Sequence, residues 1–271
     1  MNTAELQDVA RRLRFDAIDA IYRAQSGHPG SSLSTMEMLV ALYIGGVLKH
    51  DPKNPQSDDR DYFLLSNGHA CPGWYAVLAE AGYFPKNELQ KLRQLDAAAQ
   101  GHPHRGSLPG VEISSGSLGQ GLSVGIGIAA GLKLAGKTSH VYVMMSDGEQ
   151  QEGSTWEAIM SAPKFGLTNL IAIVDKNKFQ IDGATEDVMP GLDPLADKYR
   201  AFNWDVQEID GHQFEEIFSA LTKAQRADKP AVIISHTSRG KGVSFMENSD
   251  HWHAGAITDE QFATAKKDLG V

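Results

Sequence analysis

The chain has 271 residues, 41% of them hydrophobic, with 25 basic and 34 acidic side chains and a net charge of −9. This balance argues against a general nucleic-acid or anionic-membrane surface, although it leaves room for a local positive pocket. The single cysteine, Cys71, excludes an intramolecular disulfide framework and favours a cytoplasmic location. The first residues lack an apolar run and no stretch approaches about eighteen apolar residues, so neither a signal peptide nor a membrane span is expected.

The N-terminal part predicts two helices separated by a loop. Apolar residues at helical spacing predict an amphipathic helix over 4–25. A loop rich in helix-breaking residues is expected at 25–30. Ser34 is expected to cap a buried helix over 36–47, with Glu37 at the capping-box position.

Short apolar runs and helix-forming segments then alternate along the chain. The apolar runs predict strands over 62–65, 140–145, 170–174, 205–209 and 231–236. The segments between them predict helices over 72–81, 120–135, 157–164, 197–202 and 213–226. This alternation favours an α/β fold with a doubly wound parallel sheet and helices on both faces. We expect one domain over 1–271, with an extended loop and a terminal helix at about 237–271.

The predicted helix 120–135 carries small residues four apart: Gly121, Gly125 and Ala129. A nicotinamide-type glycine fingerprint is the competing interpretation. We reject it because no clear strand precedes these glycines and because they continue along the helix. Small residues at this spacing predict instead that the helix lies very close to a neighbouring element.

The stretch from Ser146 to Gly183 predicts a cation and diphosphate site. Strand 140–145 ends just before Asp147, and strand 170–174 ends just before Asn177. About thirty residues of strand, helix and strand suit a parallel crossover, so both side chains reach one edge of the sheet. Each residue alone is typical of an ordinary turn. Together their oxygens suit Mg²⁺ or Ca²⁺ better than zinc, and the backbone N–H groups at Gly148–Glu149 suit a diphosphate.

Four histidines lie in loops beside glycine or proline: His28, His69, His102 and His253. A single loop histidine is typically exposed, but four of them near a phosphate-binding edge predict a shared pocket. Imidazoles there can donate to hydroxyls and phosphates or move protons near neutral pH. A zinc site built on His102-x-His104 and His251-x-His253 is the alternative, although the sequence singles out no set of three or four ligands.

The central stretch resembles the thiamine-diphosphate motif, Gly-Asp-Gly followed by Asn about thirty residues later, with Ser146 in place of the first glycine. The surrounding residues are similar to transketolase in particular: Glu152-Gly153, Glu157-Ala158 and Asp175-x-Asn177-x-x-x-Ile181-Asp182-Gly183. The resemblance implies the thiamine-diphosphate-binding fold, with thiamine diphosphate and Mg²⁺ as cofactors and Ca²⁺ or Mn²⁺ as substitutes. It also implies transfer of a two-carbon ketol unit from a ketose phosphate to an aldose phosphate, as in the pentose phosphate pathway.

The resemblance also implies roles for individual residues. His28, His69 and His102 would face the sugar, and His69 and His253 would approach the diphosphate, although this chain has His253-Ala254-Gly255 where the family commonly has His-Gly. The residues implied for the metal are Asp147, Asn177 and, through its carbonyl, Phe179. Those implied around the cofactor include Gly116, Leu118, Asp147, Gly148, Glu149, Asn177 and Ile181. Glu152 and Glu157 match interface acids that link two active sites.

The resemblance runs from about residue 4 to the end and covers only the N-terminal part of a transketolase. In the family, the acid that activates the cofactor ring and most residues that grip the substrate phosphate belong to the next domain. We therefore expect the N-terminal subunit of a split transketolase, acting with a separate C-terminal subunit, as an α2β2 assembly. A truncated form is the weaker alternative.

Three other functions stay open at this stage. The chain could be a split transketolase for a sulfosugar or branched sugar, because the residues that contact the far end of the substrate belong to the partner. It could be the α subunit of a 2-oxoacid dehydrogenase, although the histidine loops favour sugar chemistry. It could also be a non-catalytic regulatory or scaffold subunit, against which the retained Asp147, Asn177 and histidines argue.

Overall fold

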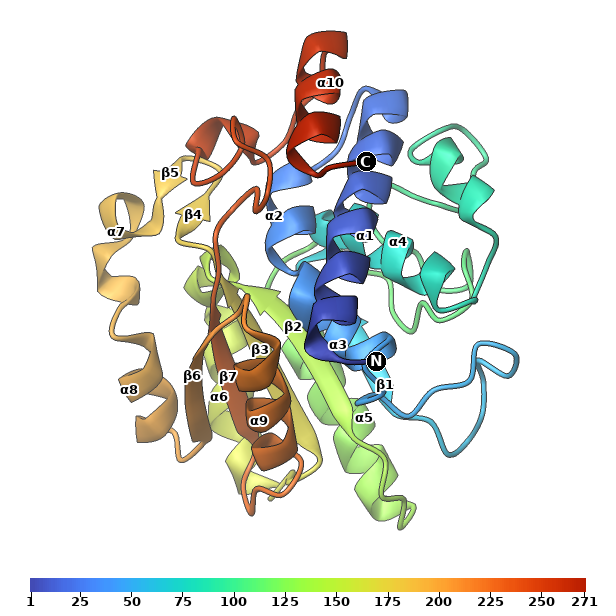
Figure 1. The fold of residues 1–271 in the computed structure, drawn as a ribbon. Coiled ribbons are helices and arrows are strands. Elements are labelled where there is room, and N and C mark those ends of the chain that lie inside the picture. The colour runs from blue at the N-terminus through green and yellow to red at the C-terminus, as the bar shows by residue number, and fades with distance from the viewer.

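The computed structural model describes residues 1–271 and is built around one five-stranded sheet of order β1-β2-β3-β7-β6 (Figure 1). All neighbouring strands are parallel, which confirms the predicted sheet. Ser146 pairs with Asp175, and Asp175 pairs with Ser235, so three strands end together at one edge. The strands are β1 (Tyr62–Leu65), β2 (Val141–Ser146), β3 (Leu170–Lys176), β6 (Asp205–Asp210) and β7 (Ala231–His236).

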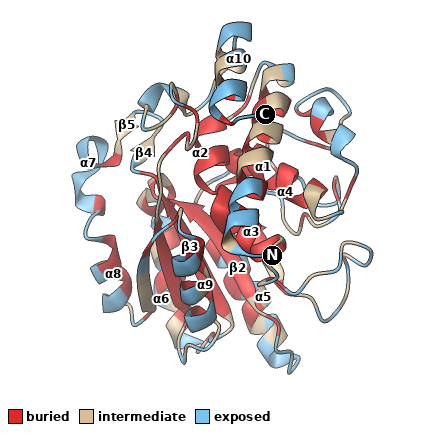
Figure 2. Ribbon diagram, in the orientation of Figure 1, coloured by how far each residue is buried: buried red, intermediate tan, exposed pale blue.

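The three central strands are buried on both faces, as continuous apolar runs require. Successive side chains point to opposite faces, so Val143 belongs to one hydrophobic core and Met144 to the other. Figure 2 shows the resulting pattern, with buried strands at the centre and exposed surfaces on the outer helices. The sheet therefore separates two cores, one on each side.

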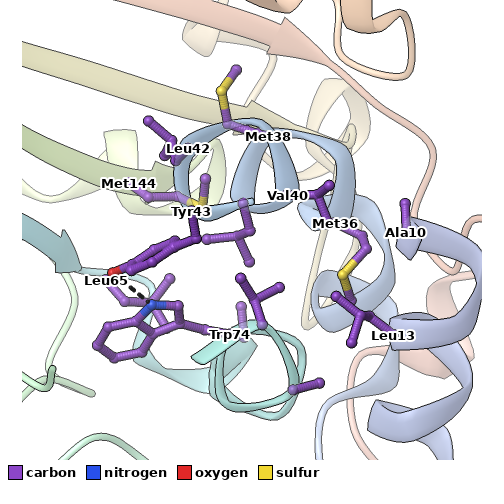
Figure 3. Packing of buried hydrophobic residues seen from close by; sticks show 14 of the residues in the cluster. Ala10, Leu13, Met36, Met38, Val40, Leu42, Tyr43, Leu65, Trp74 and Met144 are labelled. Atoms are coloured by element: carbon purple, nitrogen blue, oxygen red, sulfur yellow. Dashed lines mark hydrogen bonds between the residues drawn. The ribbon is translucent and has the colours of Figure 1, made fainter. Parts of the chain in front are cut away.

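The larger core lies between the sheet and the N-terminal helices. Its helices are α1 (Thr3–Ala24), α3 (Met36–Tyr43), α4 (Cys71–Glu80), α9 (Phe214–Ala224) and α10 (Asp259–Asp268). Leu13 of α1 and Met36 of α3 pack side by side, and Trp74 donates to the Tyr43 hydroxyl at 3.1 Å (Figure 3). At the end of the chain α10 lies beside α1, where Arg11 donates to the carbonyl of Gly270 at 3.1 Å.

The second core lies under α5 (Gly121–Leu134), α6 (Gly153–Lys164) and α8 (Leu195–Ala201). The small-residue row on α5 lets this helix approach the sheet, as predicted. A Cβ on Gly121 would lie 2.2 Å from the Ser66 hydroxyl, and one on Gly125 would lie 2.5 Å from a methyl of Val143. These glycines are therefore required by packing and do not form a nucleotide fingerprint.

Three predictions for the N-terminal segments are wrong. The loop expected at 25–30 is partly helical, because Pro29 begins a short helix, α2 (Pro29–Ser34). Ser34 does not cap α3; its hydroxyl donates to Asp175 at 2.7 Å, and Glu37 forms a buried ion pair with Arg14 at 2.5 Å. The helix expected over 36–47 ends at Tyr43, just before Gly45–Gly46.

Several short elements were not predicted. A hairpin of β4 (Phe179–Gln180) and β5 (Gly183–Ala184) follows β3 and leads into α7 (Thr185–Val188). Helix α6 begins at Gly153, four residues before its expected start. The chain also has short 3₁₀ helices: η1 (Gly68–Ala70), η2 (Lys86–Lys91), η3 (Gly148–Gln151), η4 (Pro190–Leu192) and η5 (Asp250–Trp252). None of the helices combines the length and apolar character needed to cross a membrane.

Candidate functional site

Asp147 and Asn177 lie at the carboxyl ends of the adjacent strands β2 and β3, as predicted. The Asp147 N–H donates to the carbonyl of Asp175 at 3.3 Å, and the Asp147 carboxylate accepts from the Lys178 N–H at 2.6 Å. The Asn177 amide in turn donates to the Asp175 carboxylate at 2.9 Å. These bonds hold both side chains at one edge of the sheet.

The Asp147 carboxylate is fully buried, and its hydrogen-bond donors are the backbone N–H groups of Gly148 and Lys178. Burial, with the nearby charge of Asp175 adding to it, raises the pKa of Asp147 to about 7. A buried carboxylate that lacks a cationic side chain as partner is costly when ionised. Its oxygens, the Asn177 amide oxygen and the Phe179 carbonyl are the ligands predicted for the metal, and oxygen donors of this kind suit a hard divalent cation.

The four predicted histidines meet, although they are far apart in the sequence. The ring centroid of His28 lies 5.4 Å from that of His69, 5.7 Å from that of His102 and 5.3 Å from that of His253. The rings of His69 and His253 are 5.2 Å apart. The predicted shared histidine pocket is therefore present as a cluster of imidazoles.

Burial keeps these imidazoles neutral. It lowers the pKa of His28 to about 3 and, together with the Arg239 charge, that of His253 to about 4. Burial is also the largest cause that lowers the pKa of His69 and His102. Arg239 donates to Nδ1 of His253 at 2.8 Å, which leaves the proton of the neutral ring on Nε2. The cluster can thus donate and accept hydrogen bonds without carrying charge at neutral pH.

A cavity of about 360 Å³ joins the histidine cluster to the strand ends. This volume falls within the usual range for small-molecule sites, about 300–1,000 Å³. The predicted residues that line it are His28, His69, His102, Gly116, Leu118, Gly148, Glu152, Asn177, Phe179, Ile181 and His253. Asp147 lies buried beside it, whereas Glu149 and Glu157 do not line it.

The backbone N–H of Glu149 was expected to face a diphosphate, but in the structure Glu149 bonds to other residues of the chain. Its N–H donates to the Ser146 hydroxyl at 3.3 Å, and its buried carboxylate accepts from the Gly119 N–H at 2.8 Å and from the Ser66 hydroxyl. These bonds tie the turn after β2 to the loop that carries Leu118. They also give Ser146 a function that the glycine usual at this position could not perform.

The cavity wall around Gly116 depends on glycine. Gly116 has φ +139° and Gly119 has φ +81°, a region that other residues rarely adopt. A Cβ on Gly116 would lie 3.1 Å from the His102 ring, and one on Gly119 would lie 2.6 Å from Cβ of Glu152. The loop can therefore follow the cavity closely only with glycine at these positions.

Sequence reasoning missed four lining residues: Ser31, Gln151, Gln180 and Arg239. The Ser31 hydroxyl lies 3.2 Å from Nε2 of His69, and Arg239 binds His253. The only local signal for Arg239 was its place before a glycine in the extended loop expected from about residue 237. His104 and His251, on which the zinc alternative depends, are exposed. No group of three or more His, Cys, Asp or Glu side chains is arranged to hold a metal ion.

Several buried polar atoms in or beside the cavity have no partner within the chain: Nδ1 of His28, Oγ of Ser115 and Nε of Arg239. Such atoms are costly unless a ligand or water bonds to them. A diphosphate with a hydroxyl-rich substrate could supply partners for the two atoms that belong to lining residues, those of His28 and Arg239. The residues present therefore fit thiamine diphosphate, a divalent cation and a polyhydroxyl substrate.

The two residues predicted for an interface, Glu152 and Glu157, are exposed at the beginning of α6, and Glu152 also lines the cavity. Met160 of the same helix is 60% exposed, and Phe165, directly after the helix, is 50% exposed. On the neighbouring α5, a Cβ at Gly127 or Gly131 would meet nothing within 4 Å. The outer surface of α5 and α6 is thus partly apolar and built from small residues that no packing within this chain requires.

Comparison with known proteins places this site in context. The family described as "Transketolase, thiamine diphosphate binding domain" matches residues 6–271. One of the subunits of the apulose-4-phosphate transketolase of Phocaeicola vulgatus is 38% identical, over 99% of this chain and 94% of that protein. The "6-deoxy-6-sulfo-D-fructose transketolase subunit SqwG" of Clostridium sp. is 41% identical, over 98% of this chain and 96% of that protein. The solved transketolase of Campylobacter jejuni superimposes with a TM-score of 0.93 at 35% identity, over 100% of this chain and 43% of that one.

Proposed function

The chain belongs to the transketolase family, and we propose that it is the N-terminal subunit of a thiamine-diphosphate-dependent transketolase. It would transfer a two-carbon ketol unit from a ketose phosphate to an aldose phosphate. One observation carries the proposal: four neutral imidazoles line the same cavity as the strand ends that carry Asp147 and Asn177. A diphosphate-and-metal edge and a hydroxyl-binding cluster are thereby joined in one site.

The residues of this chain would divide the work between cofactor and sugar. Asp147, Asn177 and the Phe179 carbonyl would hold Mg²⁺, with Ca²⁺ or Mn²⁺ as substitutes. Thiamine diphosphate, when bound, supplies the carbon nucleophile for ketol transfer. His28 and His102 would bind and move protons of the sugar hydroxyls, since neutral imidazoles can both donate and accept. His253 would donate from Nε2 to the diphosphate, because Arg239 occupies its Nδ1.

The proposed enzyme contains a second kind of chain. Two similar proteins are named as subunits and match almost their whole length, whereas this chain covers 43% of a solved transketolase. We propose an α2β2 assembly in the cytoplasm, in which the partner contributes the rest of the active site. The exposed apolar surface of α5 and α6, with Glu152 and Glu157 at its edge, is the surface that supports such an assembly.

A second candidate concerns the substrate. The two similar subunits are named for apulose 4-phosphate and for 6-deoxy-6-sulfo-D-fructose. Identities of 38% and 41% over nearly the whole chain favour a variant sugar as an alternative to the ketose phosphates of the pentose phosphate pathway. The reaction type would be the same for both kinds of sugar. The two kinds differ in the part of the sugar that lies far from the reacting carbonyl.

The test combines the purified chain with a separate C-terminal transketolase chain, thiamine diphosphate and Mg²⁺. Ketose phosphates, a branched ketose phosphate and a 6-sulfo ketose are offered as donors, and pyruvate serves as the control for 2-oxoacid chemistry. We expect ketol transfer to an aldose phosphate only when both chains are present. Full transfer by this chain alone would refute the two-chain assembly, and oxidation of pyruvate would refute sugar chemistry.

A further inference from the structure

The turn after β6 is packed directly against the end of β7. The Gly211 N–H donates to the carbonyl of His236 at 2.8 Å. A Cβ at Gly211 would lie 2.1 Å from the Ser235 hydroxyl and 2.6 Å from the methyl carbon of Thr237, so only glycine lets the two segments approach this closely. His212 therefore follows at a position that the backbone fixes, beside the loop that leaves β7.

The His212 imidazole joins two parts of the chain. Its Nδ1 lies 3.0 Å from the Glu37 carboxylate, and its Nε2 accepts from the Ser238 N–H at 2.9 Å. A ring nitrogen that accepts from a backbone N–H carries no proton, so the ring is neutral and its proton lies on Nδ1, which donates to Glu37. The imidazole thus has one defined tautomer and one defined orientation.

The contact between His212 and Glu37 is not required to balance a charge. Glu37 is fully buried, and Arg14 forms an ion pair with it at 2.5 Å. Although burial raises the pKa of Glu37, the charge of Arg14 and the hydrogen bond from His212 lower it to about 2, so the carboxylate is ionised. Because Arg14 supplies the counter-ion, the carboxylate serves the imidazole as a fixed acceptor that orients the ring.

The imidazole in turn fixes a segment that lies between the metal-binding edge and the cavity wall. Ser238 is flanked by Thr237, whose hydroxyl donates to the Asp175 carboxylate at 2.5 Å, and by Arg239, which lines the cavity. The Asn177 amide donates to the same Asp175 carboxylate at 2.9 Å. A shift of Ser238 would therefore disturb both the cavity wall and the hydrogen bonds that orient a predicted metal ligand.

We propose that His212 is a positioning residue for the active site: through the Ser238 N–H it holds the loop after β7 and, with it, the orientation of the Asn177 amide. The inference rests on the proposed function, in which Asn177 is a metal ligand. His212 does not line the cavity, so it acts only through these bonds. Removing a group that orients a metal ligand from behind typically weakens metal binding about 10- to 100-fold.

A purely structural role for His212 is the competing explanation, and two substitutions separate the two roles. Asparagine places its amide where Nδ1 lies, so His212→Asn keeps a donor for Glu37 but leaves the Ser238 N–H without an acceptor. Glutamine reaches the position of Nε2, so His212→Gln offers its carbonyl to Ser238 but gives up the bond to Glu37. The control is His236→Asn, which removes a nearby imidazole that bonds to Glu208 at 3.1 Å.

Two quantities are measured for the folded variants. Hydrogen exchange of the Ser238 amide in the full chain reports the bond itself. Calorimetric titration with thiamine diphosphate and Mg²⁺, with a separate C-terminal transketolase chain present, reports the effect on the site. His212→Asn is expected to speed the exchange at least about tenfold and to weaken cofactor binding about tenfold, whereas His212→Gln and His236→Asn should stay within about threefold of wild type.

Wild-type affinity in His212→Asn, or a loss in His212→Gln as large as that in His212→Asn, would overturn the inference and leave the proposed function intact. A wild-type enzyme that binds no thiamine diphosphate would contradict the proposed function, and the Ser238 exchange rates then decide alone whether His212 holds the loop. If His212→Asn does not fold, the imidazole nitrogen resonances of the wild-type chain decide. A protonated Nδ1 with a bare Nε2 supports the inference, and a protonated Nε2 overturns it.

Discussion

Replacing His28 with glutamine is expected to make the protein less sensitive to acid. The imidazole of His28 is partly buried among other basic groups, and its pKa falls to about 3. Burial is the main cause, and the charges of His253, His102, Arg93 and Arg239 lower the pKa further. Glutamine keeps a polar side chain at this position but cannot take up a proton.

The size of the stability loss in acid follows from the difference between the pKa values of His28 in the folded and unfolded chain. The unfolded histidine titrates at its usual value of about 6.5, so between about pH 6.5 and 3 the unfolded chain binds the extra proton. The stability that neutral His28 contributes is therefore present above about pH 6.5 and is lost as the pH falls. At about pH 5 the loss amounts to about 2 kcal/mol, or about 1–2 kcal/mol after allowance for partial exposure.

Urea denaturation followed by circular dichroism, near pH 7 and near pH 5, measures this effect. Between these two conditions the wild-type free energy of unfolding should fall by about 1–2 kcal/mol more than that of His28→Gln. The control is His104→Gln, which removes an exposed histidine outside the cavity and should behave as wild type. Equal losses in wild type and His28→Gln would refute the conclusion that burial keeps this imidazole neutral.

Three further predictions concern the metal, the sugar and the packing. Asp147→Ala should abolish Mg²⁺-dependent cofactor binding by the assembled enzyme, and unchanged calorimetric affinity would contradict the metal assignment. His102→Ala should retain cofactor but lose ketol transfer, and wild-type turnover would contradict its role. Gly125→Ala should lower the free energy of unfolding by about 1–3 kcal/mol, because its methyl group would lie 2.5 Å from Val143. The control Gly127→Ala, whose methyl group would meet nothing within 4 Å, should leave the free energy of unfolding unchanged or raise it by up to about 1 kcal/mol. Equal effects of the two substitutions in thermal unfolding would count against this packing.

The family and the parallel sheet were predictable because both depend on local patterns. Apolar runs of strand length indicated the five sheet strands, and turn residues after two of them placed Asp147 and Asn177 at one edge. The match over residues 6–271 confirms the resemblance to transketolase that these motifs indicated. A strand that is buried on both faces has a composition that few other elements share, so its position can be predicted without tertiary information.

The wrong prediction of a cap at Ser34 has a tertiary cause. Ser34 followed by Glu37 has the form of a capping box, yet both side chains are used by distant partners, Asp175 and Arg14. A local hydrogen-bond pattern predicts a cap only when tertiary contacts offer those side chains nothing better. Glu149 shows the same effect, because its carboxylate binds Gly119 and Ser66 beneath the cavity.

Sequence alone was enough to identify which residue types could meet a diphosphate, a divalent cation and a sugar, because strand ends and loop motifs are local features. The three-dimensional packing was needed to show that His28, His69, His102 and His253 each lie within 6 Å of a neighbouring ring. It was also needed to show that Arg239 lies beside them without a carboxylate partner. Burial sets the charge state and the partners of a side chain, and burial depends on which distant segments pack against it.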